Sequence, residues 1–257
     1  MELTKHEQGL FLECLLEMGD LLLDSGAEIS RVEDTLNRMG RSYGSERTNV
    51  FVIPSLISIS ISFPGNDAIT ETRRIRSNGS TDFYRLEKLN SLSRECSANP
   101  VPLDELQQRL AKVASGRKPF FMVLAGSILG AGGFAVFFGG NLWDGLAAAM
   151  FGAVICLLQR SISRTQLNTT AANLLVSMLI GLGVGLVTSL IPTLHMDMIL
   201  IGDIMLLIPG LTMTNAIRNT LVGNTISGVV RLAETLIWAG SLAGGFMLAL
   251  TIVELLR

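Results

Sequence analysis

The sequence predicts a two-part protein: an α+β domain in residues 1–117, followed by an all-α membrane domain in residues 118–257. Charge supports this division, because residues 1–118 hold 15 of the 20 Lys and Arg and 17 of the 22 Asp and Glu. Glycine is distributed the opposite way, with 18 of 26 after residue 118. Apolar segments of bilayer length occur only in the second part. We expect the first domain to be cytosolic, since its polar start, Met1 to Glu7, does not resemble a signal peptide.

Two amphipathic helices are expected at the start of the first domain. Apolar side chains recur at helical spacing from Leu10 to Leu22 and again from Ile29 to Tyr43. Gly26 is a suitable C-terminal stop for the first helix. The second helix has two candidate capping boxes, and the pattern does not choose between them: Ser25 with Glu28, and Ser30 with Glu33.

A change of period then predicts two strands and two further helices. Isoleucine and serine alternate through residues 57–63, which is typical of a half-buried strand. Residues 64–67 predict a turn, and residues 69–76 are expected to pair back as a polar, arginine-bearing strand. Helices are then expected over residues 82–97 and 102–115. The predicted order of elements in this domain is therefore ααββαα.

Five apolar segments predict five transmembrane helices, the fourth of them broken at Pro209-Gly210. At about 1.5 Å of rise per residue, each uninterrupted segment spans or nearly spans a bilayer core of about 30 Å. Lys and Arg precede the first segment and recur in alternate loops, which predicts a cytoplasmic N-terminus and an outside C-terminus. The segments are residues 119–138, 142–158, 169–191, 198–221 and 232–255.

The break in the fourth segment is the most informative feature of the membrane half. Proline lacks a donor and glycine loosens the backbone, and lipid tolerates such a break only where protein or water satisfies the freed groups. The residues that follow carry hydroxyl, amide and guanidinium groups: Thr212, Thr214, Asn215 and Arg218. A broken helix followed by polar groups is typical of a membrane site for a small anionic or zwitterionic solute. We therefore predict that these four residues bind the substrate of a transporter.

Each of these side chains also has a structural interpretation. Arg218 can hold a carboxylate by two parallel hydrogen bonds, or it can anchor the helix at the cytosolic surface. Thr212 can cap the restarted helix, and both Thr212 and Thr214 can instead bond back to the helix near the break. The residues alone leave these alternatives open.

Four more polar residues are candidates for coupling or gating. Asp203 lies roughly 9 Å inward from the outer loop, where a charge costs on the order of 3 kcal/mol. It can carry a coupling proton or ion, bind a substrate ammonium, or be a protonated or paired packing residue. Glu234 is a second coupling candidate, although it can also form a structural ion pair with Arg231, three residues earlier. Asn224, in the preceding loop, is a candidate gate.

Other functions have little support in the sequence. The chain has no basic patch with interleaved aromatic residues, which argues against nucleic-acid binding. Its cysteines are far apart and its histidines have no nearby cluster of partners, so we expect no metal, no cofactor and no enzymatic activity. The cysteines are expected to be packed thiols. These residues are Cys14, Cys96, Cys156, His6 and His195.

Three ordered motifs resemble signatures of the threonine/serine exporter family. They are residues 22–33, 209–218 and 227–234, and the resemblance covers nearly the whole chain. Within that family the chain is similar to the larger subunit of the split type, which includes the bacterial succinate exporter subunit. The resemblance implies a multi-pass exporter of the bacterial plasma membrane, for threonine and serine or for succinate-like dicarboxylates. It also implies a small all-membrane partner subunit. Paired glycines in the predicted helices permit close helix packing and are also consistent with a homo-oligomer.

The resemblance also bears on individual residues. Glu28, Arg31 and Glu33 match the N-terminal motif of the family, either as the lining of a cytosolic vestibule or as residues that cap and bridge helices. Asn219 and Asn224 depart from the pattern, because the family often has aspartate at these positions. If the aspartates of the family carry coupling protons, Asp203 and Glu234 are the remaining candidates for this role in the present chain.

Two other classes of function compete with a transporter. One is a membrane-anchored regulatory or scaffold protein whose N-terminal domain binds a ligand or a partner. A plain anchor needs neither a broken helix nor Asp203, which argues mildly against this class. The other is a self-assembled channel, which accumulation of a solute against its gradient would exclude.

Overall fold

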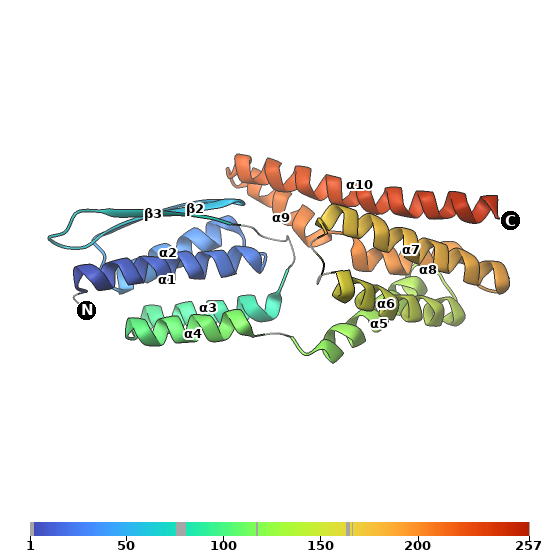
Figure 1. Ribbon diagram of the computed structural model, residues 1–257, viewed down its shortest axis with the longest axis horizontal. Coiled ribbons are helices and arrows are strands. Elements are labelled where there is room, and N and C mark those ends of the chain that lie inside the picture. Colours follow the sequence, from blue (N-terminus) through green and yellow to red (C-terminus); the bar gives the residue numbers. More distant parts are fainter. Residues whose placement is uncertain (1–2, 76–80, 117, 163–164, 166, 257) are drawn as a thin grey trace. The chain divides into compact units, whose positions relative to one another are not determined.

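The computed structural model describes residues 3–75, 81–116, 118–162, 165 and 167–256 (Figure 1). The chain forms two compact units. The N-terminal unit contains Met1–Arg117 and Leu211–Leu232, and the apolar unit contains Lys118–Gly210 and Ala233–Arg257. The segment after the predicted helix break therefore belongs with the N-terminal residues. The division into a cytosolic domain and a membrane domain at residue 117 stays a prediction.

Four helices of the N-terminal unit lie close to their predicted positions: α1 (Lys5–Asp24), α2 (Ile29–Ser42), α3 (Phe83–Ala98) and α4 (Leu103–Ser115). A capping box between Thr4 and Glu7 starts α1. Gly26, with a φ of 83°, follows its end, as predicted.

Neither capping box predicted for α2 forms. The helix begins after Glu28, whose side chain makes no capping hydrogen bond. Ser25 instead ends α1, with its backbone N–H bonded to the Leu21 carbonyl. Glu33 uses its carboxylate elsewhere, accepting a hydrogen bond from the Val52 backbone N–H at 3.1 Å. Ser25 and Glu33, which the local pattern predicted as capping residues of α2, therefore make other contacts in the folded structure.

The sheet has three strands, so the predicted order ααββαα is corrected to ααβββαα. Strands β1 (Arg47–Ile53), β2 (Leu56–Ser62) and β3 (Ile69–Arg74) are antiparallel and lie in sequence order. The prediction missed β1 because polar or exposed residues occupy one face of this edge strand, and Phe51 is 58% exposed. The predicted end of the last strand, Arg76, lies outside the described residues.

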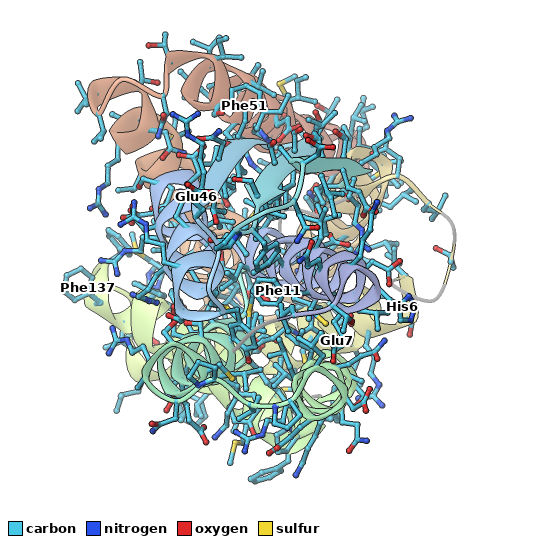
Figure 2. All side chains as sticks on the ribbon, turned by 90° about the vertical axis from the view of Figure 1, so that its left-hand side faces the viewer. His6, Glu7, Phe11, Glu46, Phe51 and Phe137 are labelled. Atoms are coloured by element: carbon cyan, nitrogen blue, oxygen red, sulfur yellow. The ribbon has the colours of Figure 1, made fainter. Side chains whose placement is uncertain are left out.

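The N-terminal unit has three layers: the sheet, then α1 with α2, then α3 with α4 (Figure 2). Ile57, Ile59 and Ile61 of β2 are completely buried beneath the sheet. Phe11, labelled in Figure 2, is also completely buried and stacks on Tyr43 with ring centroids 4.4 Å apart. Burying these large side chains supplies the main stabilisation of this unit.

The structure supports four of the five predicted membrane spans as unbroken helices, and the fourth predicted span is a bent helix pair. Four of the described helices are long and apolar enough to cross a membrane: α5 (Phe120–Phe137), α6 (Leu142–Ile162), α7 (Thr169–Leu190) and α10 (Thr225–Leu255). The last of these, α10, begins in the N-terminal unit and continues into the apolar unit. The chain is therefore a mostly helical, multi-pass membrane protein with a small sheet.

The predicted break of the fourth segment is present. Helix α8 (Met196–Leu207) ends before Pro209, and α9 (Gly210–Leu221) starts at Gly210. The pair reaches the length and hydropathy of a membrane span only when both helices are taken together, either as a broken span or as a re-entrant loop. Between four and five spans are thus present among the described residues.

Candidate functional site

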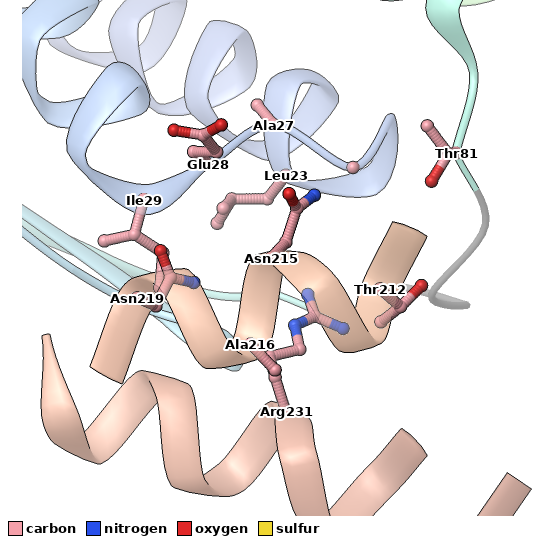
Figure 3. A pocket seen from close by; sticks show the side chains of 11 residues that line it. Leu23, Ala27, Glu28, Ile29, Thr81, Thr212, Asn215, Ala216, Asn219 and Arg231 are labelled. Carbon is pink, nitrogen blue, oxygen red and sulfur yellow. The ribbon is translucent and has the colours of Figure 1, made fainter. Parts of the chain in front are cut away.

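A pocket of the N-terminal unit joins four segments that are far apart in the sequence (Figure 3). They are the turn from α1 into α2, the segment before α3 that contains Thr81, the polar side of α9, and the first turns of α10. We call this the α9 pocket. Its lining residues are Leu23, Gly26, Ala27, Glu28, Ile29, Thr81, Thr212, Asn215, Ala216, Asn219 and Arg231.

The turn between α1 and α2 forms one wall of the pocket because Gly26 adopts a left-handed backbone conformation. The N–H of Ala27 bonds to the Leu22 carbonyl and the N–H of Gly26 bonds to the Leu23 carbonyl, which is the Schellman pattern. A side chain at Gly26 would also meet Thr81, whose hydroxyl oxygen would lie 3.0 Å from the added Cβ. The sequence of the turn thus fixes where Ala27 and Glu28 stand.

The opposite wall is a tight pair of helix segments, α9 and the start of α10. A Cβ at Gly228 would lie 2.7 Å from the Thr220 backbone N and 2.9 Å from the Ala216 carbonyl oxygen, so only glycine permits this approach. Gly223, with a φ of 95°, makes the turn between the helices. This packing brings Arg231 of α10 to the same pocket as the side chains of α9.

Helix α9 presents one polar stripe to the pocket. Thr212, Asn215 and Asn219 are three and four residues apart, which places them on one face of the helix. Figure 3 shows both amides beside the α1–α2 turn. Within the described part of the chain, neither side-chain amide has a protein hydrogen-bond partner, so both can bind a solute or water.

Charges of both signs line the pocket. Glu28 forms an ion pair with Nη1 of Arg218, and its other oxygen lies 3.9 Å from Nε of Arg31. The Glu28 side chain is 18% exposed, whereas that of Arg218 is 56% exposed. Arg231 lines the same pocket from α10. The site therefore offers a carboxylate and guanidinium groups to a bound molecule.

The structure gathers some of the predicted substrate-binding residues and separates others. Thr212 and Asn215 line the pocket, and Arg218 reaches its edge through Glu28. Thr214 is exposed and is not among the lining residues. Thr212 does not cap α9, because the helix already starts at Gly210 and places Thr212 in its first turn. Pro209 separates α8 from α9.

Of the three residues matched to the N-terminal family motif, two lie at the pocket and one does not. Glu28 lines the pocket, and the exposed Arg31 accompanies it as an ion-pair partner. Glu33 instead ties α2 to β1 through the Val52 N–H. Burial raises the pKa of Glu33, and this hydrogen bond partly opposes the rise. Glu33 is therefore a bridging residue of the fold.

Of the candidates for coupling and gating, Arg231 lines the pocket, whereas Asp203, Glu234 and Asn224 lie outside its lining. Asp203 belongs to the apolar unit and is completely buried, and neither of its carboxylate oxygens has a hydrogen-bond partner among the described residues. Glu234 is exposed on α10, one turn after Arg231. The carbonyl of Asn224 accepts the Gly228 N–H at the start of α10.

Two polar residues of the pocket lining were not predicted as site residues. Asn219 was noted only as a departure from the family pattern, although its spacing of four from Asn215 is a local signal for a shared helix face. Thr81 lies in a connecting segment with no recognisable motif, so only the folded structure places it at the pocket.

The structure gives His195 a carboxylate partner that the sequence analysis did not name. Its backbone N–H donates to Oδ1 of Asp144 at 2.8 Å, and its Nδ1 lies 2.9 Å from Oδ2 of the same residue. Asp144 is completely buried and also accepts the Asn141 N–H at 2.9 Å. This cluster links the start of α6 to the start of α8. Cys14, Cys96 and Cys156 are buried free thiols, as predicted.

Metal binding has no support in the described residues, which contain no group of three or more His, Cys, Asp or Glu side chains placed to hold an ion. A multi-pass protein with a broken helix pair, α8 and α9, and a charged pocket lined by α9 is of the membrane transport class. The comparisons with known proteins give the family. The family model described as "Putative threonine/serine exporter" matches residues 13–253, and the chain belongs to this family.

Three curated relatives have exporter or transporter names. The chain is 23% identical to the threonine/serine exporter of Corynebacterium glutamicum over its full length and 22% identical to the probable threonine/serine exporter of Mycobacterium tuberculosis over 93% of its length. It spans only 54% and 45% of those two proteins. It is 21% identical, over 98% of its length and 97% of the relative, to the probable succinate transporter subunit YjjP of Klebsiella aerogenes. No solved structure matches the chain.

Proposed function

We propose that this chain is a subunit of a secondary exporter of small carboxylated metabolites in the bacterial plasma membrane. Membership of the exporter family supports the reaction class. The observation that carries the assignment of a site is the α9 pocket, in which guanidinium, amide and hydroxyl groups converge next to a helix break. Helix breaks of this kind hold solutes in secondary transporters because they free backbone and side-chain groups inside the membrane protein.

The chemistry of the pocket suits a small carboxylate. Arg231 and Arg218 each offer a planar set of N–H donors that can bind a carboxylate through two hydrogen bonds. The amides of Asn215 and Asn219 and the hydroxyl of Thr212 supply neutral donors and acceptors for a hydroxyl or an ammonium group. Threonine and serine carry all of these groups, and they are the first candidate substrates.

Succinate-like dicarboxylates are the second candidate, because the relative that matches this chain over nearly its whole length is named as a succinate transporter subunit. Such a solute would need a cation at each end, and Arg31, Arg218 and Arg231 supply three near the pocket. Both candidates have in common a carboxylate bound by arginine.

Asp203 is the proposed carrier of the coupling proton. It is buried in the apolar unit without a hydrogen-bond partner among the described residues. An ionised carboxylate in such a place is costly, and ionisable residues inside membrane segments usually take part in ion or proton movement. Glu234 is the alternative coupling residue.

A small all-membrane partner subunit is proposed to complete the exporter. The Corynebacterium relative is roughly twice as long as this chain, and the Klebsiella relative is named as a subunit. Lipid would surround exposed apolar side chains of the spans, such as Phe121 and Phe137, which are 77% and 79% exposed. In this proposal the N-terminus is cytoplasmic and the C-terminus is outside.

The proposal is tested by efflux from cells preloaded with labelled threonine, serine or succinate. Arg218→Ala and Arg231→Gln are compared with wild type at equal abundance in the membrane, and Arg74→Ala, on β3 outside the pocket, is the matched control. We expect each pocket variant to lose at least about tenfold in efflux, because a lost charged hydrogen-bond pair costs about 1.5–3 kcal/mol. Full efflux in both pocket variants would remove the α9 pocket from the transport path.

A further inference from the structure

Glu28 occupies the position in the α9 pocket that a solute carboxylate would need. Its carboxylate pairs with Nη1 of Arg218, and Arg31 approaches from the other side at 3.9 Å. Arg218 is thus already engaged by an anion of the protein itself. A solute that binds Arg218 through a carboxylate must first take the place of Glu28.

Glu28 also lines two cavities of the N-terminal unit. A second pocket, reaching towards α3, shares five lining residues with the α9 pocket, among them Glu28 and Asn215, and it includes Arg31. Glu28 therefore faces a solute in either cavity. The low exposure of this side chain, 18%, shows that it is held within the site and does not extend into solvent.

An ion pair of this kind accepts a zwitterion more easily than a dianion. When a zwitterion enters, its carboxylate can take Arg218 while its ammonium takes the released Glu28 carboxylate, so every charge keeps an opposite partner. When a dicarboxylate enters, one of its carboxylates can take Arg218, but its second carboxylate and the released Glu28 then compete for the remaining guanidinium groups of Arg31 and Arg231. A like charge in a partly desolvated site is unfavourable.

We infer that Glu28 is the specificity-determining residue of this site, and that it selects zwitterionic amino acids over dicarboxylates by exchanging Arg218 for the solute ammonium. This inference rests on the proposed function of the α9 pocket. It assigns the ammonium to Glu28 and the carboxylate to Arg218, with Asn215 beside both. Glu28 acts in recognition, and Arg31 keeps its carboxylate oriented when Arg218 is released.

The test is the binding of labelled threonine and of labelled succinate to the purified full-length chain. Glu28→Gln removes the charge and keeps the shape of the side chain. Asp34→Asn is the matched control, since Asp34 is an exposed acid on the same helix and lines neither pocket. Glu28→Asp keeps the charge on a shorter side chain. It separates the effect of the charge from any loss of folding caused by a substitution at position 28.

For Glu28→Gln we expect the dissociation constant for threonine to rise at least about tenfold, while that for succinate falls or stays the same. Glu28→Asp should keep the wild-type preference for threonine, and Asp34→Asn should change neither constant. Equal changes for both solutes in Glu28→Gln, or no change, would overturn the inference and leave the pocket as a carboxylate site. A wild-type chain that binds neither solute would overturn the proposed function of the pocket and the inference with it.

Discussion

The cores of the two units differ in how far they use small side chains. The core of the N-terminal unit is made of large residues, and its biggest fully buried side chains include Tyr43, Phe11 and Met18. The apolar unit buries small residues such as Ala131 and Ala135 beside larger ones such as Ile155 and Phe246, and many large apolar side chains of its helices are exposed.

This difference agrees with the prediction that the N-terminal domain is surrounded by water. In water, burying large apolar surface stabilises a fold, and the N-terminal unit buries its large apolar side chains. In lipid no comparable hydrophobic force drives helices together, and stability depends on close approach through glycine and alanine. The same kind of substitution should therefore have different effects in the two units.

The largest expected effect is the loss of a buried aromatic ring in the N-terminal unit. Phe11→Ala should lower the free energy of unfolding by about 3–5 kcal/mol, because it leaves a cavity next to Tyr43. Phe51→Ala, on the exposed face of β1, is the matched control and should cost less than about 0.5 kcal/mol. Thermal unfolding of the purified variants measures both changes. Similar losses at the two positions would contradict the account of this core.

The next effect tests close helix packing in the apolar unit. A Cβ at Gly245 of α10 would overlap the Leu174 carbonyl oxygen and the Ser177 hydroxyl, whereas nothing lies within 4 Å of a Cβ at Gly244. Gly245→Ala should destabilise the protein by about 1–3 kcal/mol through overpacking. Gly244→Ala should be neutral or slightly stabilising. Unfolding in detergent compares the neighbouring variants, and equal stability would show that α10 and α7 are not in close contact.

A smaller effect separates the two buried aspartates of the apolar unit. Asp144→Asn should cost about 1–3 kcal/mol, because an amide cannot accept all the hydrogen bonds that Asn141 and His195 donate. Asp203→Asn should leave stability unchanged, since that carboxylate has no such bonds among the described residues, but it should reduce coupled efflux. Unfolding and efflux are measured on both variants. A loss of stability at Asp203 with normal efflux would make it a packing residue.

The smallest effect is a pH dependence at Glu33. Burial raises the pKa of this carboxyl above its ordinary value of 4.5, so the folded state holds the proton more tightly than the unfolded state. Its contribution to stability is complete below pH 4.5 and is lost as pH rises through the raised pKa. Glu33→Gln should flatten the dependence of unfolding on pH in that range, because glutamine is neutral and can still accept the Val52 N–H. If the free energy of unfolding depends on pH equally in Glu33→Gln and in wild type, other titratable groups determine that dependence.

The spans and the helix break were predictable because they depend on local composition. Hydropathy marks every candidate span, and Pro209 with Gly210 breaks a helix by backbone chemistry alone. The stop of α1 at Gly26 is local for the same reason. Strand β1 was missed because its alternation consists partly of exposed residues such as Phe51, which weakens the periodic signal.

The site was only partly predictable because its key contacts are distant in sequence. Thr212 and Asn215 follow the break directly, so a local pattern found them. The pairing of Arg218 with Glu28 joins residues 190 positions apart, and that of His195 with Asp144 joins residues 51 apart. One sequence shows each of these residues, but their partners are set by tertiary packing.

The most direct test of the central claim, that this chain exports a small carboxylated metabolite, is net efflux against a gradient. Cells that produce the full-length chain, with and without a small partner subunit, are preloaded with labelled threonine, serine or succinate and placed in medium that already contains more of the same solute. The account predicts that at least one solute leaves these cells faster than control cells that lack the chain. Efflux equal to that of the control cells for all three solutes, with and without the partner, would contradict it.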